Sequence, residues 1–340
     1  MSEGAQIPLS PVSGLTLSGP DLLEVDNVVM QYPNGVQAVA GVSIKVRRGE
    51  TLAIVGESGC GKSTLARVIM RILVPSGGRI MFDGENISRL GQRQLKRMRA
   101  RFQMVFQDPY ASLNPRQTIR STLESQLSLL SITRKERQQR VEEIIERVGL
   151  DPTALDRLPH EFSGGQRQRI GIARACIVRP DLLVCDEPVS ALDVSIRAQI
   201  LNLLLDMQRE RGITMLFISH DMSVVRHMAD SVAVMYLGRI VEISTVDELF
   251  SNPRHPYTAA LLLSVPVTHP RDRSRSRVSL DGDPPSQLKP PSGCSFHPRC
   301  SSARDLCRSD MPTLSGNGVS EALVACHFPL NRNTMQQLSA

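Results

Sequence analysis

The sequence lacks any apolar run long enough to cross a membrane. Its longer apolar runs, such as VAVMYL at 232–237, fall far below the roughly 20 residues that a spanning helix needs. The N-terminal residues 1–20 have no basic start and no apolar core. They are rich in Gly, Pro and Ser, which predicts a loose tail and not a signal peptide. We therefore expect a cytosolic chain, in which the seven cysteines do not form structural disulfides.

Aromatic side chains are scarce, at 4% of residues, and none is interleaved with the basic clusters at 93–101, 134–140 and 271–277. The net charge of +6 is mild for a chain of 340 residues, which is long enough for one large domain with additions. Proteins that bind single-stranded nucleic acid combine basic grooves with aromatic stacking platforms. We interpret the clusters as solvated faces or linkers and predict no nucleic-acid partner. A nucleic-acid-associated protein is the rival class.

A glycine-rich stretch, GESGCGKS at 56–63, follows the apolar run TLAIVG and precedes a helical pattern. The strand–loop–helix context predicts a phosphate-binding loop. Backbone N–H groups from Gly59 to Ser63 would surround the β-phosphate of a nucleotide. Lys62 would neutralise the β- and γ-phosphates, and the Ser63 hydroxyl would ligate magnesium.

Two further apolar runs end in residues that suit catalysis. DLLVCDEP at 181–188 becomes acidic at its end, where two carboxylates are costly unless a cation or substrate needs them. Asp186 suits a magnesium ligand acting through water, and Glu187 suits a base that polarises the attacking water. TMLFISH at 214–220 ends in His220, at the strand end where α/β folds bind their ligands. Such strands, alternating with helical segments, predict a mostly parallel sheet covered by helices.

These stretches, with FSGGQRQRIGIARA at 162–175 and SALD at 190–193, resemble the ATP-binding cassette ATPases over roughly residues 22–260. The resemblance implies an α/β fold: a P-loop NTPase (RecA-like) core with an antiparallel β subdomain and a helical signature subdomain at about 108–175. It assigns catalysis to Glu187, His220 and Gln107, and magnesium to Ser63, Gln107 and Asp186. Its ATP-binding residues are Tyr32, Gly56, Ser58, Gly59, Cys60, Gly61, Lys62, Ser63, Thr64, Ser163, Gly164, Gly165, Gln166 and Asp193. Tyr32 would stack on adenine, with a core tyrosine as the alternative.

The element FSGGQ has a particular role in that family. It caps the γ-phosphate held by a partner's loop when two cassettes close head to tail. Ser163 and the N–H groups of Gly164 and Gly165 suit such an anion because glycines before a helix let its N-terminus approach closely. The resemblance therefore implies a dimer, with a second ATPase of the same kind or with another copy of this chain.

Further similarities indicate which type of ATP-binding cassette protein this chain resembles. The segment between Gln107 and Ser163 has no sustained heptads, which disfavours DNA-repair relatives with long coiled coils. FQDPYASLNPR at 106–116 and NPRHPYTAALLLSVP at 252–266 resemble the oligopeptide/dipeptide importer ATPases, closer to the second ("F") type of the paired subunits. The resemblance implies two membrane permeases, an extracytoplasmic substrate-binding protein, and a peripheral place on the cytoplasmic face of the inner membrane. Nickel, glutathione and opines are alternative cargoes of this branch.

The composition changes after the cassette, so we divide the chain into a tail (1–21), a cassette (22–265) and an extension (266–340). The extension is rich in Pro, Ser and Arg and holds Cys294, Cys300, Cys307 and Cys326, without the CxxC knuckle of common zinc sites. In the importer family a matching quartet holds an iron–sulfur cluster, and we expect a four-iron four-sulfur cluster here. Zinc is the alternative, with His297 or His327 as a substitute ligand. The other cysteines, including Cys60, are interpreted as packing residues.

Overall fold

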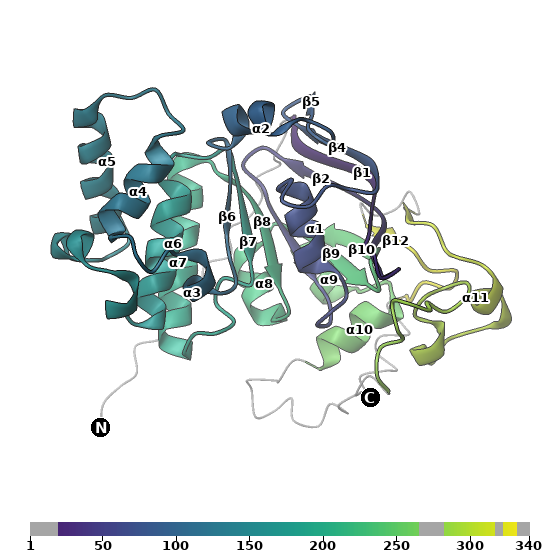
Figure 1. Ribbon diagram of the computed structural model, residues 1–340. Coiled ribbons are helices and arrows are strands. Elements are labelled where there is room, and N and C mark those ends of the chain that lie inside the picture. Colours follow the sequence, from purple (N-terminus) through teal and green to yellow (C-terminus); the bar gives the residue numbers. More distant parts are fainter. Residues whose placement is uncertain (1–19, 265–281, 317–321, 332–340) are drawn as a thin grey trace, which may run out of the picture.

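The computed structural model describes residues 20–264, 282–316 and 322–331. Figure 1 shows a block of helices on one flank, the strands at the centre, and the C-terminal segment on the other flank. Residues 1–19 of the predicted tail lie outside the described residues. So do residues 265–281, which include the basic cluster at 271–277 and most of the predicted linker.

One sheet is antiparallel and comes from the N-terminal part of the cassette. Within the described residues it has four strands in the order β2-β1-β4-β5. Their bounds are β1 Asp21–Gln31, β2 Gln37–Arg47, β4 Gly77–Phe82 and β5 Glu85–Asn86. Side chains such as Val25, Ile44 and Phe82 are buried in one core with helix α1, Lys62–Ile69. This sheet is the predicted antiparallel β subdomain.

The second sheet carries the catalytic candidates. Within the described residues it has eight strands in the order β11-β12-β10-β9-β3-β8-β7-β6, and the run from β9 to β6 is parallel. Their bounds are β3 Thr51–Val55, β6 Phe102–Val105, β7 Leu182–Asp186, β8 Thr214–Ser219, β9 Ser231–Tyr236, β10 Arg239–Thr245, β11 Ser315–Gly316 and β12 Leu323–Val324. The predicted mostly parallel sheet is confirmed.

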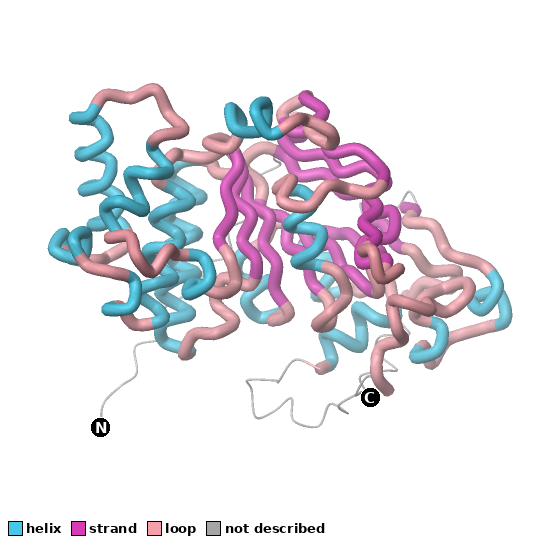
Figure 2. The backbone as a smooth tube through the Cα atoms, viewed as in Figure 1, coloured by secondary structure: helices cyan, strands magenta, loops and turns pink. Residues whose placement is uncertain are grey.

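The pleat of the parallel strands separates two cores. In β7, Leu182 and Val184 lie in the core that contains α1, whereas Leu183 and Cys185 lie in the core that contains α6 and α7. Successive side chains of a strand point to opposite faces, so one short apolar run serves both cores. Helix α1 and the pair α6–α7 therefore cover opposite faces of the sheet, and Figure 2 shows helices on both sides of the strands.

The helical block lies on the left in Figure 1. Its helices are α3 Pro109–Ser112, α4 Ile119–Leu127, α5 Arg134–Arg147 and α6 Gly164–Cys176. Helix α5 begins with a capping box, in which Thr133 accepts from the N–H of Glu136 and Glu136 accepts in return from Thr133. Leu123, Ile144 and Ile170 meet in the same core. These helices occupy the range predicted for the helical signature subdomain, about 108–175.

The remaining α-helices lie outside this block. They are α2 Gln92–Met98, α7 Val194–Arg211, α8 Met222–Met228, α9 Val246–Ser251, α10 Pro256–Leu263 and α11 Asp305–Ser309. Among the described residues, none of the helices is both long and apolar enough to cross a membrane. The apolar run at 232–237 instead forms most of β9, a buried strand of the central sheet.

The described part of the C-terminal extension packs on the cassette. Strand β12 pairs antiparallel with β10 and so extends the main sheet. The Phe296 ring lies against the rings of Tyr236 and Tyr257, with centroids 5.3 and 5.4 Å away. Arg254 donates from Nε to the carbonyl oxygen of Leu330 over 2.9 Å. The extension thus shares a core with the cassette.

Candidate functional site

The phosphate loop, residues 56–63, connects β3 to α1. Gly56 and Gly61 have φ angles of 154° and 109°, which L side chains rarely adopt. A Cβ at Gly56 would lie 2.2 Å from the carbonyl oxygen of Met235, and one at Gly61 would lie 2.1 Å from that of Ala38. These two positions therefore accept only glycine, because any larger side chain would collide with the neighbouring backbone carbonyls and displace the loop.

The side chain of Lys62 lies folded into the loop. Lys62 is only 4% exposed, and its Nζ donates to the carbonyl oxygens of Gly56 and Glu57 over 2.8 Å each. An ammonium held by backbone carbonyls can exchange them for phosphate oxygens. Of the other predicted loop residues, Ser58 and Gly59 are exposed, whereas Cys60 is buried and burial raises its thiol pKa.

A hydroxyl and a carboxylate lie together beside the loop. Ser63 Oγ donates to Asp186 Oδ1 over 2.8 Å, which joins the start of α1 to the end of β7. Desolvation raises the pKa of Asp186, because burial disfavours its charged form. A divalent cation would stabilise that buried charge, and oxygen ligands are those that Mg²⁺ prefers. The structure therefore brings two of the predicted magnesium ligands together.

The three predicted catalytic residues also meet. Gln107, Glu187 and His220 follow the ends of β6, β7 and β8, which are adjacent and parallel. Gln107 Nε2 donates to Glu187 Oε2 over 3.0 Å, and His220 Nδ1 lies 3.3 Å from Glu187 Oε1. The Glu187 side chain is 14% exposed, so its carboxylate lies at an opening that water can enter. Such an arrangement suits a general base and its two positioning partners.

Tyr32 and Thr64 lie together on the α1 side of the loop. Tyr32 follows β1, and its Oη lies 3.2 Å from Thr64 Oγ1. The Tyr32 ring is half-buried and also packs against the core that contains α1. Both sequence interpretations have support here, because the ring contacts the core and lies beside the nucleotide loop. The adenine-stacking role stays a prediction.

The signature residues lie at the start of α6, where Ser163 is exposed. Ser163 caps α6: its Oγ accepts from the N–H of Gln166 over 3.3 Å, and Gln166 Oε1 accepts from the Ser163 N–H over 3.0 Å. Gly164 is open to space, whereas a Cβ at Gly165 would lie 2.6 Å from the Ile196 side chain. Helix α6 covers the sheet face opposite to α1. The capped N-terminus is therefore accessible to a partner.

Asp193, the remaining predicted ATP-binding residue, begins a different helix. It occupies the N-cap position of α7 in an extended conformation, and it is exposed. Its side chain makes no capping hydrogen bond within its own chain. The carboxylate is therefore accessible from outside the chain, as its predicted place at an interface requires.

Comparison with known proteins agrees with this geometry. The family model of ABC transporters matches residues 39–190, and that of the oligopeptide/dipeptide transporter C-terminal region matches residues 241–307. The chain is 53% identical to the oligopeptide transport ATP-binding protein AppF of Bacillus subtilis, over 86% of this chain and 90% of AppF. The chain belongs to the ATP-binding subunits of oligopeptide/dipeptide ABC transporters. It is also 50% identical to the dipeptide transport ATP-binding protein DppF of Escherichia coli, over 86% of each chain.

Solved structures of ABC cassettes support the same fold. The cbiO1 protein of Clostridium perfringens, part of the ABC transporter complex cbiONQ, superposes with a TM-score of 0.62. It is 32% identical and covers 68% of this chain and 91% of its own. The dimeric ATP-binding cassette MJ0796, bound to ADP and Pi, is 27% identical with a TM-score of 0.61, over 66% of this chain and 98% of its own. This ABC subunit thus has the predicted α/β cassette fold.

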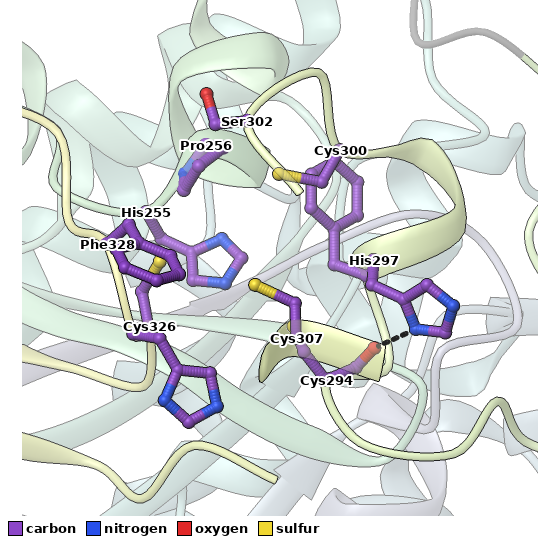
Figure 3. Close-up of a pocket in the computed structure, with 11 residues that line it drawn as sticks. His255, Pro256, Cys294, His297, Cys300, Ser302, Cys307, Cys326 and Phe328 are labelled. Carbon is purple, nitrogen blue, oxygen red and sulfur yellow. Dashed lines mark hydrogen bonds between the residues drawn. The ribbon is translucent and has the colours of Figure 1, made fainter. Parts of the chain in front are cut away.

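The extension of the ABC subunit brings its four cysteines to one pocket, shown in Figure 3. Cys307 is buried and the other three are partly buried, and burial raises the pKa of Cys326 to about 11. Among the residues that the structure describes, no group of three or more His, Cys, Asp or Glu is placed to hold a metal ion. The four thiols nevertheless line the same pocket. The predicted iron–sulfur or zinc site is not confirmed.

Two residues of the ABC subunit were missed in the sequence. His255 lines the cysteine pocket and is fully buried; its Nδ1 accepts from the Tyr257 N–H over 3.0 Å, and its Nε2 has no partner. Arg299, next to Cys300, forms an ion pair with Glu57 of the phosphate loop. Neither had a usable signal, because each acquires its partners from distant segments.

Proposed function

We propose that this chain is the ATP-hydrolysing subunit of an importer of di- and oligopeptides. The observation that carries the proposal is the meeting of Gln107, Glu187 and His220 beside the Ser63–Asp186 pair. In this arrangement Glu187 accepts a proton from the attacking water. Gln107 and His220 hold its carboxylate in place, and His220 also faces the reacting phosphate.

ATP and magnesium bind at the phosphate loop and the Ser63–Asp186 pair, next to the three catalytic residues. Lys62 leaves the loop carbonyls and neutralises the β- and γ-phosphates, while the loop N–H groups surround the β-phosphate. Ser63, Gln107 and Asp186 would hold Mg²⁺ on this chain, Asp186 through a water molecule. When bound, the cation spreads the charge that develops on the transferred phosphoryl group.

A complete site needs two cassettes. Ser163 at the capped N-terminus of α6 and Asp193 at the start of α7 are both exposed. They suit the γ-phosphate held by a second ATPase subunit or by another copy of this chain. ATP then joins the two cassettes, and hydrolysis releases them.

The remaining partners follow from this assembly. Two permease subunits span the membrane, and the chain binds them as a peripheral subunit on the cytoplasmic face of the inner membrane. An extracytoplasmic binding protein delivers the peptide. The relatives' printed functions in oligopeptide and dipeptide transport support this cargo over nickel, glutathione or opines. The proposed organisation is a cassette at 22–265 and an extension at 266–340.

We also propose that the cysteine pocket holds a four-iron four-sulfur cluster. The fit rests on four thiols around one pocket and on the buried His255 Nε2, which lacks a partner there. Cys294, Cys300, Cys307 and Cys326 would be the ligands, and the cluster would cross-link a segment with a small core of its own. Anaerobically purified protein should be brown, with iron and sulfide in equal amounts. One colourless zinc per chain would favour zinc, and a metal-free chain would contradict both.

Reconstitution tests the transport function. The chain, assembled with its permeases and paired ATPase in proteoliposomes, should drive ATP-dependent uptake of a labelled dipeptide in the presence of the binding protein. The Glu187→Gln variant is the matched control, since it should bind ATP without driving uptake. Uptake of nickel or glutathione in place of the dipeptide would move the assignment to another cargo. Binding of DNA at low salt, without permease association, would contradict the transport class.

A further inference from the structure

The cysteine-bearing extension contacts the phosphate loop directly. Arg299, next to Cys300, donates from both terminal nitrogens to Glu57, with Nη1 to Oε2 at 2.7 Å and Nη2 to Oε1 at 3.0 Å. The Arg299 side chain is only 5% exposed. Gln287 makes a second contact, since its Nε2 donates to the carbonyl oxygen of Gly59 over 2.7 Å. Two points of the loop are therefore held by a segment more than two hundred residues away along the chain.

Glu57 is the centre of these contacts. Its N–H donates to Tyr257 Oη over 2.9 Å, and its carbonyl oxygen accepts from Lys62 Nζ over 2.8 Å. The carboxylate takes the two-pronged bond from Arg299. One residue thus connects the extension to the lysine that meets the phosphates. A bidentate arginine–carboxylate pair fixes orientation as well as distance.

Arg299 is itself held firmly by the extension. Three residues before it, Phe296 packs edge-on against Tyr236 and also against Tyr257 and His255. The turn at 297–299 places the guanidinium between this aromatic group and the loop, and Arg299 Nη1 also lies 3.5 Å from Tyr236 Oη. A change in the cysteine pocket, which Phe296 lines, therefore acts on the same turn.

The charges show why this contact matters for nucleotide binding. A carboxylate in the phosphate loop repels the triphosphate unless a cation neutralises it. The Arg299 side chain is 5% exposed and that of Glu57 is 24% exposed, so water screens this pair only in part. Arg299 provides that cation. Without it, Glu57 would place an unpaired negative charge beside the binding site and would be free to turn toward Lys62.

We propose that Arg299 is a positioning residue for ATP binding: it orients and neutralises Glu57, and through it the cysteine-bearing extension sets the affinity of the phosphate loop. This inference rests on the proposed ATP site at that loop. The extension then has a role at the nucleotide and is more than a cover of the cassette. Neither Arg299 nor Glu57 touches the reacting atoms.

A double-mutant cycle on the full-length chain tests this proposal, with ATP affinity measured by isothermal titration calorimetry. Arg299→Met should weaken ATP binding about tenfold or more, since it leaves Glu57 unpaired. Glu57→Gln should bind ATP as tightly as the wild type or more tightly. The double variant should return to within about threefold of the wild type, because no uncompensated charge remains. The control is Arg304→Met, because Arg304 lies in the same extension and stacks on Phe328, 4.1 Å from its ring centre.

The outcomes separate the explanations. A merely structural role for Arg299 predicts that Glu57→Gln does not rescue Arg299→Met, and strictly additive losses would overturn the proposal. Unchanged ATP affinity in Arg299→Met would overturn it as well. If the control Arg304→Met loses ATP affinity equally, the effect comes from general loosening of the extension, and the proposal is again wrong. A wild-type chain that binds no ATP would overturn the proposed function and this inference with it.

Discussion

Replacing Glu187 with glutamine separates catalysis from binding at this site. The carboxylate lies between Gln107 Nε2, at 3.0 Å, and His220 Nδ1, at 3.3 Å. A glutamine side chain has the same length, and its oxygen still accepts from Gln107. Lys62 and the Ser63–Asp186 pair contact the loop and not this side chain, so the phosphate cradle stays intact. The substitution therefore removes the general base and leaves the contacts of the phosphate loop unchanged.

The expected loss follows from that separation. General bases contribute about 10²- to 10⁴-fold to a rate, so kcat should fall by that factor. This loss corresponds to an activation barrier that is higher by about 3–5 kcal/mol. The ATP dissociation constant should change less than about threefold, because the ground-state contacts are retained. Single-turnover phosphate release by the assembled ATPase measures the first quantity, and calorimetry with Mg-ATP measures the second. Near-normal turnover in Glu187→Gln would show that another group activates the water.

Three further changes test other parts of the structure. Ser163→Arg should leave ATP binding to its own chain unchanged but block hydrolysis at the partner's loop, and loss of ATP binding by the isolated variant would contradict the two-chain site. Burial lowers the pKa of His255 to about 3, so the unfolded chain binds an extra proton between that value and the ordinary 6.5. The free energy of unfolding should therefore fall by up to about 1.4 kcal/mol per pH unit as the pH drops below 6.5. The variant His255→Gln should reduce this dependence on pH, as denaturant titrations at about pH 5 and about pH 7 can measure. An unchanged pH dependence in the variant would show that His255 does not cause it. Burial raises the pKa of Cys176 to about 12, so iodoacetamide at about pH 8 should label Cys300 of the metal-free chain well before Cys176, as peptide mass mapping can show; equal labelling would contradict the burial of Cys176.

Much of the nucleotide site was predictable because its signals are local. A phosphate loop needs glycines at fixed positions, and Gly56 and Gly61 are required by contacts within a few ångströms of their own backbone. Buried strands that end in a polar residue place that residue at the carboxyl edge of a parallel sheet. The positions of Glu187 and His220 could therefore be inferred before the strand order was known.

The cysteine quartet shows the limit of such inference. Four thiols close together in the chain predicted a shared site, and they do line one pocket. Whether they converge as metal ligands depends on the directions of their side chains, which spacing does not specify. Among the residues that the structure describes, they do not form a metal-ligating group. His255 lines the same pocket but belongs to the cassette, and nothing in the sequence around it indicated that it lies beside the cysteines.

The sequence by itself determined the fold class, the phosphate loop and the family, because these depend on residue type, short spacing and hydrophobic periodicity. Only the tertiary structure decided that the extension contacts the loop. Arg299 and Glu57 are separated by 242 positions, and their pairing arises from the packing of Phe296 on Tyr236 and Tyr257 and of β12 on β10. A single charged residue near a cysteine has many possible partners in an unfolded chain. Burial of the surrounding aromatic core selects one of them, because a buried charge must be paired.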